Sequence, residues 1–256
     1  MAYRSRGVIK ELLRGVFEGI GISRYSRPGK YQLDSILQAY LPAKGVFLEV
    51  GALDGLYASN TYYLEKLCGW SGVLVEPVPH FFRECVKCRR KSRVFNCALV
   101  PDDYTEADIR MVFAGDKSAV RSATSEHELE LEPEPEHFEQ SEGRGDRHEF
   151  DASARTLTSV LDEAGAPDID FFSLDVEGYE IQVLNGLDMS RFRPEWILVE
   201  CLTPESKEEM LSYLAARNYE FVAQVTPRDL LWRAARSGSV GEAKRTYHSV
   251  RTPPAP

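Results

Sequence analysis

The sequence predicts an α/β fold in which helices cover both faces of a doubly wound, mostly parallel sheet. Short apolar runs of strand length, at residues 46–50, 72–75, 169–175 and 195–201, alternate with segments of helical periodicity. These runs are continuous rather than alternating apolar and polar, which is typical of strands buried on both faces. Hydrophobic residues make up 43% of the 256 residues, which is enough to form a sizeable core.

The remaining elements follow in chain order. Residues 6–20 have the apolar spacing of a basic amphipathic helix, which could pack on the domain, pack on a second subunit as in a homodimer, or lie on a membrane surface. A linker at 19–29 leads to a helix at 31–41, which Pro42 ends. We further expect helices at about 59–67, 79–90, 156–164, 178–186 and 205–217, and strands at 93–100, 109–114, 220–225 and 230–232. The strand at 109–114 should lie outside the cofactor-binding core.

Negative charge is concentrated in one segment. Residues 121–150 hold ten acidic residues and three arginines, which is a net charge of −7 out of −9 for the chain. This acidic insertion cannot bury enough apolar surface to fold alone, so we expect either a disordered surface loop or a lid over an acceptor site. The sequence thus divides into an N-terminal helical extension (1–44), one domain with this insertion (45–235) and a disordered tail (236–256).

The segment 46–76 predicts a strand, a turn with two glycines, a helix and a second strand ending at an acidic residue. An acid at that strand end, here Glu76, typically binds the two hydroxyls of a ribose, which indicates an adenosine-containing cofactor. The turn reads G-A-L-D-G from Gly51 to Gly55, so it lacks the third glycine of a dinucleotide site. The carboxylate of Asp54 would repel a diphosphate, whereas the ammonium and sulfonium of S-adenosylmethionine would tolerate it. We therefore expect a methyl donor rather than a nicotinamide.

The same residues resemble the FkbM family of S-adenosylmethionine-dependent methyltransferases. The resemblance rests on EVGALDG, SNT and GWSGVLVEP, supported by GKYQLD at 29–34 and DFFSLDVEGYEIQVLNG at 170–186. It implies a Rossmann-like class I methyltransferase fold with seven strands, the last antiparallel, and O-methylation of sugar or secondary-metabolite hydroxyls. Together with the strand ends, it gives an expected cofactor site of Gln32, Glu49, Gly51, Asp54, Gly55, Ser59, Asn60, Thr61, Glu76, Pro77, Asn96, Cys97 and Asp175. Asn96 and Cys97 lie at the end of the third strand, where an adenine commonly binds in such folds.

Three acidic residues are candidates for the chemistry. Asp175, Glu177 and Glu200 lie at the ends of two strands that should be neighbours, where a proton, a cation or a substrate hydroxyl must relieve their repulsion. Asp175 could act as the base for the acceptor, or Asp175 and Glu200 could bind Mg²⁺, which prefers oxygen ligands. Each carboxylate could instead cap a helix or form a salt bridge. His148 could serve as the base if the acidic insertion is a lid.

Composition limits the partners and the compartment. No concentrated cationic surface is expected, which argues against nucleic-acid binding, and no apolar run is long enough to span a membrane. Five cysteines, an odd number placed mostly in predicted helices and buried strands, fit a reducing cytoplasm. The alternatives to a methyltransferase are a nicotinamide-dependent oxidoreductase, opposed by the missing third glycine, and a non-catalytic module that has kept the cofactor fold. Nothing in the sequence identifies the acceptor molecule.

Overall fold

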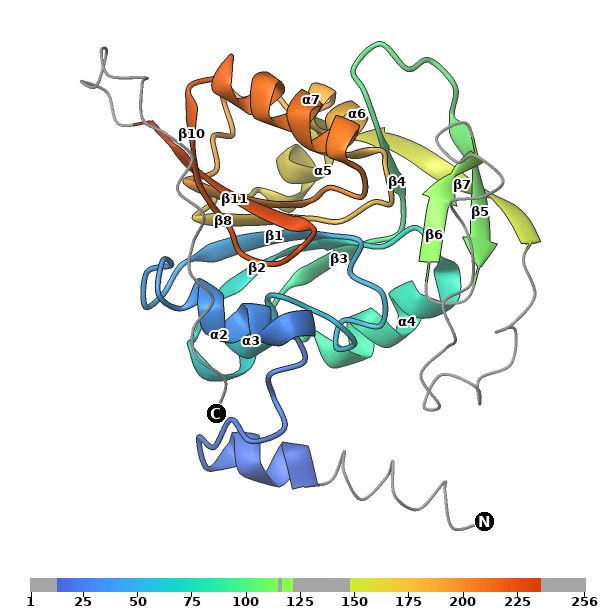
Figure 1. Cartoon of the computed structure of the whole chain (residues 1–256). Helices are drawn as coiled ribbons and strands as arrows, with labels where there is room; N and C mark the ends of the chain where they lie inside the picture. The colour runs from blue at the N-terminus through green and yellow to red at the C-terminus, as the bar shows by residue number, and fades with distance from the viewer. Residues whose placement is uncertain (1–12, 115–116, 122–147, 236–256) are drawn as a thin grey trace.

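The computed structural model describes residues 13–114, 117–121 and 148–235 (Figure 1). Within these ranges, a seven-stranded sheet lies between two groups of helices, and a smaller four-stranded sheet lies beside it. The first half of the expected N-terminal helix, most of the acidic insertion and the C-terminal tail fall outside the described residues. The expected domain division and the expected dimer therefore stay predictions.

The seven-stranded sheet has the spatial order β10-β11-β9-β8-β1-β2-β3. Its strands are β1 (Val46–Val50), β2 (Ser71–Val75), β3 (Arg93–Phe95), β8 (Phe171–Leu174), β9 (Trp196–Glu200), β10 (Tyr219–Gln224) and β11 (Asp229–Ala234). The last strand, β11, runs antiparallel to both of its neighbours, and the other neighbouring strands pair in parallel. This arrangement confirms the predicted doubly wound, mostly parallel sheet with an antiparallel last strand.

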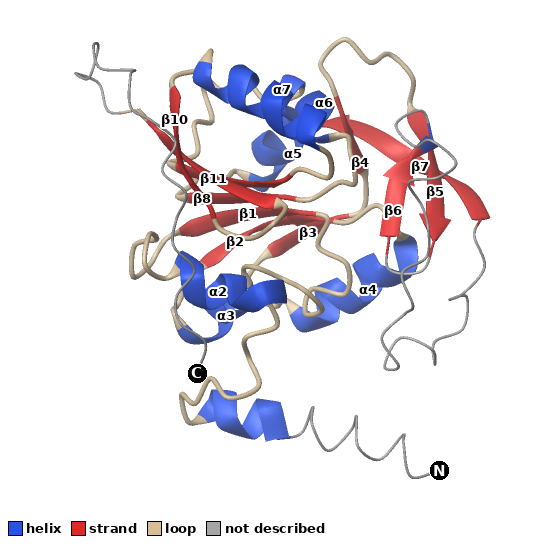
Figure 2. Cartoon of the chain, in the orientation of Figure 1, coloured by secondary structure: helices blue, strands red, loops and turns tan. Residues whose placement is uncertain are grey.

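Helices cover both faces of this sheet (Figure 2). One face carries α2 (Leu33–Leu37), α3 (Tyr62–Leu67) and α4 (Pro79–Cys88), and the other carries α5 (Leu157–Ala164), α6 (Glu180–Asn185) and α7 (Pro204–Ala215). Successive residues of a strand therefore enter different cores. Phe47 packs with Leu37 and Trp70 under the first group of helices, whereas Leu48 packs with Leu161 under the second.

After β3, the chain enters a second, four-stranded sheet beside the main sheet. It has the order β4-β7-β5-β6, with β4 (Ala98–Val100), β5 (Asp108–Ala114), β6 (Lys117–Val120) and β7 (His148–Thr156). The prediction of a single strand at 93–100 is thus wrong. The strand is interrupted at Asn96 and Cys97, and β4 pairs with β7 rather than continuing the main sheet. The strand expected at 109–114 does lie outside the main sheet, as β5. The strand β7 was not predicted, since its sequence HEFDASART contains no apolar run.

The N-terminal region differs from the expected helix at 31–41. A short 3-10 turn, η1 (Lys30–Gln32), precedes α2, which ends at Leu37. Tyr31 and Gln32 have left-handed φ angles of 53° and 60°, which an α-helix does not allow. Residues 13–19 are helical and contact α3, where the hydroxyl of Tyr62 donates a hydrogen bond to Glu18.

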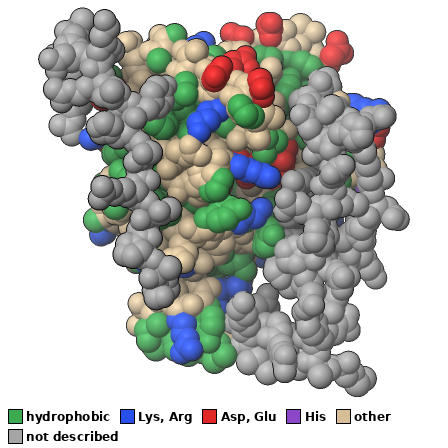
Figure 3. All heavy atoms as spheres, in the orientation of Figure 1, with side chains coloured by type: hydrophobic (Ala, Val, Ile, Leu, Met, Phe, Trp, Pro, Cys, Tyr) green, Lys and Arg blue, Asp and Glu red, His purple; other side chains and the backbone are tan. Residues whose placement is uncertain are grey.

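None of the helices in the described part of the chain has the length and apolar character needed to span a bilayer. On the face drawn in Figure 3, acidic side chains gather at the top of the view, over α7. Basic side chains on that face are scattered rather than joined into a continuous patch.

Candidate functional site

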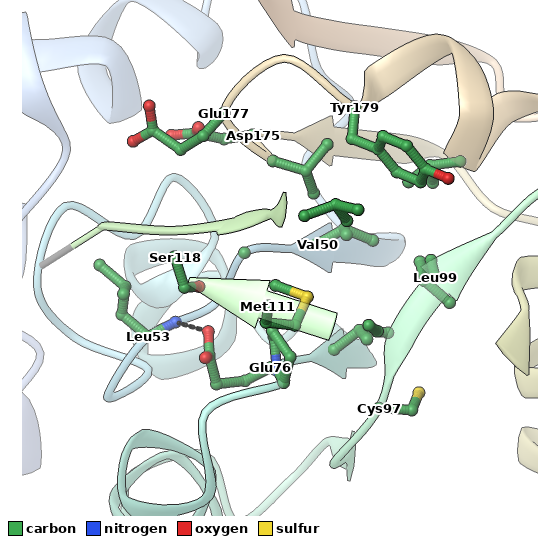
Figure 4. A pocket seen from close by; sticks show the side chains of 17 residues that line it. Val50, Leu53, Glu76, Cys97, Leu99, Met111, Ser118, Asp175, Glu177 and Tyr179 are labelled. Atoms are coloured by element: carbon green, nitrogen blue, oxygen red, sulfur yellow. Dashed lines mark hydrogen bonds between the residues drawn. The ribbon is translucent and has the colours of Figure 1, made fainter. Parts of the chain in front are cut away.

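A pocket lies where the carboxyl ends of β1, β2 and β8 meet (Figure 4). Its position is the expected one, since ligands of open α/β sheets bind at the carboxyl ends of the strands. The small sheet supplies one wall of the pocket through Met111 of β5 and through Ser118 and Val120 of β6. The sequence analysis did not predict that wall.

The Gly51 turn brings two strand ends into direct contact. Gly51 has φ +85°, a conformation that L side chains rarely adopt, and a Cβ atom there would lie 2.0 Å from the backbone oxygen of Asp175. Only glycine therefore allows the loop after β1 to pass the end of β8. This close approach places the loop from Gly51 to Gly55, called the donor loop below, and the Asp175 carboxylate at the same pocket.

Glu76 lies at the end of β2 and is only 1% exposed. Its two carboxylate oxygens accept hydrogen bonds from the backbone N–H groups of Leu53 and Val78, both at 2.8 Å, and Figure 4 shows the first of these. Burial raises the pKa of Glu76 to about 7; the two backbone hydrogen bonds oppose this shift, and the charge of Asp54 adds to it. Glu76 thus ties the donor loop to β2 and lines the pocket.

An apolar surface adjoins Glu76. Val75, Cys97, Ala98 and Leu99 line the pocket beside it, as expected for a surface that takes a flat aromatic base. Cys97 is therefore where the sequence predicted it.

The predicted residues Asn96 and Pro77 flank that surface. The exposed Asn96 turns back, and its amide donates hydrogen bonds to the backbone oxygens of Glu76 and Pro77 at 2.8 and 2.9 Å. Asn96 thus stabilises the strand end without being among the residues that line the pocket, whereas Pro77 does line it.

The predicted donor-loop residues Asp54 and Gly55 shape the turn itself. One oxygen of Asp54 accepts hydrogen bonds from the backbone N–H groups of Leu56 and Tyr57, at 2.9 and 2.7 Å, which is a local turn-stabilising pattern. Gly55 has φ +78°, and a Cβ atom there would lie 2.7 Å from the side chain of Arg89. Neither residue is among those that line the pocket.

A buried polar network supports the donor loop from below. Glu49, 3% exposed, accepts hydrogen bonds from the hydroxyls of Ser59 and Thr61 and from the backbone N–H of Asn60. Arg89, which is fully buried, forms an ion pair with Glu49 at 3.2 Å. These contacts place Glu49, Ser59, Asn60 and Thr61 in a supporting role, outside the lining of the pocket.

Arg89 also links this network to the neighbouring elements. It pairs with the buried Glu65 of α3 at 3.0 Å and donates to the backbone oxygen of Gly55 at 3.1 Å. The sequence analysis missed Arg89. The four-residue spacing of Phe81, Cys85 and Arg89, which puts all three on one face of α4, is the signal that could have found it.

Three carboxylates converge at the other side of the pocket. Asp175, Glu177 and Glu200 each offer an oxygen within 4.8 Å of the others, as the predicted pairing of their two strands required. Solvent reaches Asp175 through the open mouth of the pocket, although protein atoms surround most of the side chain. This enclosure, followed by the negative charges of Glu200 and Glu177, raises the pKa of Asp175 well above its usual range.

Glu200 has a basic neighbour, since Arg228 lies 3.9 Å from its carboxylate. The oxygen-only donor set of the three carboxylates is chemically suited to a hard divalent cation. The arrangement can therefore take up a proton, bind a cation or accept a hydrogen bond from a substrate hydroxyl.

Two further predicted residues also lie outside the lining of this pocket. His148 begins β7 and packs its ring against Phe113 of β5, with ring centroids 5.1 Å apart, and is not among the residues that line the pocket. Gln32 lies in the exposed left-handed turn before α2 and is not among them either.

The comparisons with known proteins agree with this geometry. The Methyltransferase FkbM domain matches residues 49–221, which is more than half of the chain. Methyltransferase FkbM from Methylobacillus flagellatus KT is structurally similar, with a TM-score of 0.51 and 13% identity over 82% of this chain and 49% of that chain. This chain thus spans about half the length of that protein.

Other solved structures match less well. Precorrin-6y C5,15-methyltransferase from Geobacter metallireducens GS-15 has a TM-score of 0.44 and 11% identity, over 84% of this chain and 97% of that one. TrmK from M. capricolum, in complex with S-adenosyl-homocysteine, has a TM-score of 0.41 and 6% identity, over 84% and 73% of the two chains. No curated protein matches the sequence. The match over residues 49–221 shows that this chain belongs to the FkbM family of S-adenosylmethionine-dependent methyltransferases.

Proposed function

We propose that this chain transfers the methyl group of S-adenosylmethionine to a hydroxyl oxygen of a saccharide or a secondary metabolite. The observation that carries the proposal is the position of three converging carboxylates, on Asp175, Glu177 and Glu200, at the edge of the pocket that Glu76 closes on its other side. A hydroxyl has a very high pKa, so an acceptor of this kind needs a base or a cation beside the donor.

The donor fits the pocket as follows. The apolar surface that includes Val75 and Leu99 would hold the adenine, and the carboxylate of Glu76 would accept hydrogen bonds from the ribose hydroxyls. The ionised form of Glu76 is the better acceptor, and the cationic donor favours that form. Gly51 brings the loop after β1 against the backbone of Asp175, so the donor and the Asp175 carboxylate would share one pocket.

Acceptor activation falls to Asp175. When bound, S-adenosylmethionine supplies a carbon that is already activated by its sulfonium, so the protein mainly has to align the acceptor and remove its proton. Asp175 would take the proton of the acceptor hydroxyl when the methyl group passes to that oxygen and the donor leaves as S-adenosylhomocysteine. A raised pKa suits this role, because a base works best when its pKa is close to the working pH.

A magnesium ion is the alternative way to relieve the three carboxylates. Asp175 and Glu200, joined by Glu177, would hold it through oxygen ligands. The two versions differ in their sensitivity to chelators. Loss of activity with EDTA and recovery with Mg²⁺ would support the ligand role, whereas activity that persists in EDTA would support Asp175 as the base.

Two experiments test the proposal. Calorimetry with S-adenosylhomocysteine and with NAD decides the cofactor, and binding of NAD without binding of the donor product would favour the oxidoreductase alternative. A screen of methylatable saccharides with labelled donor then seeks the acceptor. On that acceptor, Asp175→Asn should lower turnover by about 10²–10⁴-fold with donor affinity unchanged. Near-normal turnover of Asp175→Asn would leave this carboxylate with a structural role only.

A non-catalytic binding module is the second candidate function. It predicts donor binding without methyl transfer to any acceptor. Automethylation or slow hydrolysis of the donor in the wild type, abolished in Asp175→Asn, would count against it.

A further inference from the structure

Glu180, the first residue of α6, is a buried acid next to the candidate site. It is 5% exposed, and one of its carboxylate oxygens accepts hydrogen bonds from two backbone N–H groups, those of Gly178 at 3.0 Å and Val176 at 3.3 Å. These two amides flank Glu177, so a single oxygen bridges the turn that carries this residue. Charge-assisted hydrogen bonds of this kind are stronger than neutral ones.

The bridged turn is conformationally demanding. Glu177 has φ +53°, a left-handed conformation that is unfavourable for a residue with a side chain, and Gly178 follows with φ +97°. Backbone of this kind persists only where the surroundings hold it. Glu180 supplies that hold, because the bridge requires the amides of Val176 and Gly178 to converge on one point.

The location of Glu180 is electrostatically unfavourable. Burial raises the pKa of Glu180, while its hydrogen bonds from Gly178 and Val176 oppose the rise and the charge of Glu200 adds to it. A fourth acid beside Asp175, Glu177 and Glu200 increases their mutual repulsion. The position of Glu180 is explained if a hydrogen-bond acceptor is needed at this point to shape the turn.

We propose that Glu180 is a positioning residue that fixes the turn at 176–178 and thereby sets the geometry of Asp175 and Glu177 relative to Glu200. The turn connects directly to Asp175 at the end of β8, so a change in its backbone moves both side chains. The consequence for turnover rests on the proposed function, whereas the effect on the turn does not.

The test compares Glu180→Ala with Glu180→Gln. Glutamine keeps an acceptor oxygen at the same reach, so it should preserve the bridge, whereas alanine removes it. The first readout is the exchange rate of the Gly178 amide, measured by nuclear magnetic resonance. In Glu180→Ala, we expect the Gly178 amide to exchange at least about ten times faster than in the wild type, because its hydrogen bond is lost. In Glu180→Gln, the rate should stay near the wild-type value.

The second readout is kinetic. Turnover on the acceptor found by the screen should fall by about 10²-fold in Glu180→Ala, as expected when reacting groups are misplaced by about 1 Å. Affinity for S-adenosylhomocysteine should be unchanged, and Glu180→Gln should restore most of the turnover. Glu205→Ala is the matched control, since Glu205 is also an acid in the first turn of a helix but is exposed.

A Gly178 amide that stays protected in Glu180→Ala overturns the positioning role, whether or not an acceptor is known. If Glu180→Ala does not fold, Glu180→Asp keeps the charge but shortens the reach by one methylene and must show the faster Gly178 exchange. A wild type that methylates no acceptor counts against the proposed function, and the Gly178 readout still decides the role of Glu180.

Discussion

The raised pKa of Glu76 makes the stability of the fold depend on pH. The ordinary pKa of this carboxyl group is 4.5, and burial raises it to about 7 in the folded protein. Below pH 4.5, the group is protonated in both the folded and the unfolded chain, and folding pays no penalty for it. As the pH rises from 4.5 to about 7, the unfolded chain loses this proton while the folded protein retains it, so the free energy of unfolding decreases and then levels off above pH 7.

The size of this effect follows from the two pKa values. Each pKa unit corresponds to about 1.4 kcal/mol, so the difference between 4.5 and about 7 predicts a loss of about 3 kcal/mol between pH 4.5 and pH 8. Asp175 and Glu180 also have raised pKa values and act in the same direction. The contribution of Glu76 must therefore be isolated by difference.

The assay is urea unfolding of the wild type and of Glu76→Gln between pH 5 and pH 8, followed by circular dichroism. The variant lacks the titrating group, so its stability should decrease by about 2.5 kcal/mol less than that of the wild type over this range. At pH 5 the variant should be the less stable protein by about 1–3 kcal/mol, because an amide cannot accept from both backbone N–H groups. Glu84→Gln, which changes an exposed glutamate of α4, is the matched control and should parallel the wild type.

Donor binding gives an independent check. At pH 6.5, about three-quarters of the free protein should carry the Glu76 proton if the pKa is about 7. Binding of S-adenosylhomocysteine to the ionised form should therefore release most of a proton, which calorimetry in buffers of different ionisation enthalpy measures. Parallel stability curves for wild type and Glu76→Gln, with no proton release on binding, would refute the reasoning for Glu76.

The remaining predictions concern the support of the donor loop. Gly51→Ala should destabilise the fold by about 2–4 kcal/mol, because a Cβ atom would combine an unfavourable φ with a clash against backbone; in Gly165→Ala, where the φ is also positive but nothing lies within 4 Å, thermal unfolding should show a loss of only about 1 kcal/mol. Arg89→Met should cost about 3–5 kcal/mol, because two buried glutamates lose their partner, and the stability should return when both are also changed to glutamine; a mild effect of Arg89→Met alone would contradict the ion-pair network. Asn96→Ala should cost about 1 kcal/mol in chemical unfolding, since its side chain is exposed and one of its two hydrogen bonds is exposed and the other only part-buried, and a loss of more than tenfold in donor affinity would show that it contacts the donor directly.

The sequence predicted the main sheet well because its strands are buried on both faces. The strand expected at 195–201 is β9 (Trp196–Glu200), and the expected adjacency of Asp175 and Glu200 follows from the parallel pairing of β8 and β9. Continuous apolar runs of this kind have few alternative explanations. The ends of such strands are therefore predictable, and so is the cluster of carboxylates that they bring together.

The small sheet and the support of the donor loop could not be predicted in the same way. The strand β7 is half polar because one face meets solvent, and its pairing with β5 depends on residues far away in the chain. Arg89 and Arg90 are adjacent and alike in sequence, yet Arg89 is buried and Arg90 is exposed. What separates them is the fold around the end of α4, where the Arg89 side chain meets the backbone oxygen of Gly55 and two buried glutamates, which is a tertiary property.

The raised pKa values in this pocket imply that stability and function oppose each other. Burial favours the protonated forms of Glu76 and Glu180, and enclosure by protein atoms, with the help of the charges of Glu200 and Glu177, favours the protonated form of Asp175, so the fold is most stable when these acids carry little charge. A cationic donor and an acceptor that must lose a proton both favour the ionised forms. The donor should therefore bind more tightly, and its stabilising effect on the fold should grow, as the pH rises from about 5 to about 7, while the free protein becomes less stable over the same range. Sites that hold such opposing demands are typically functional, because a pocket selected only for stability would have replaced these acids with apolar residues.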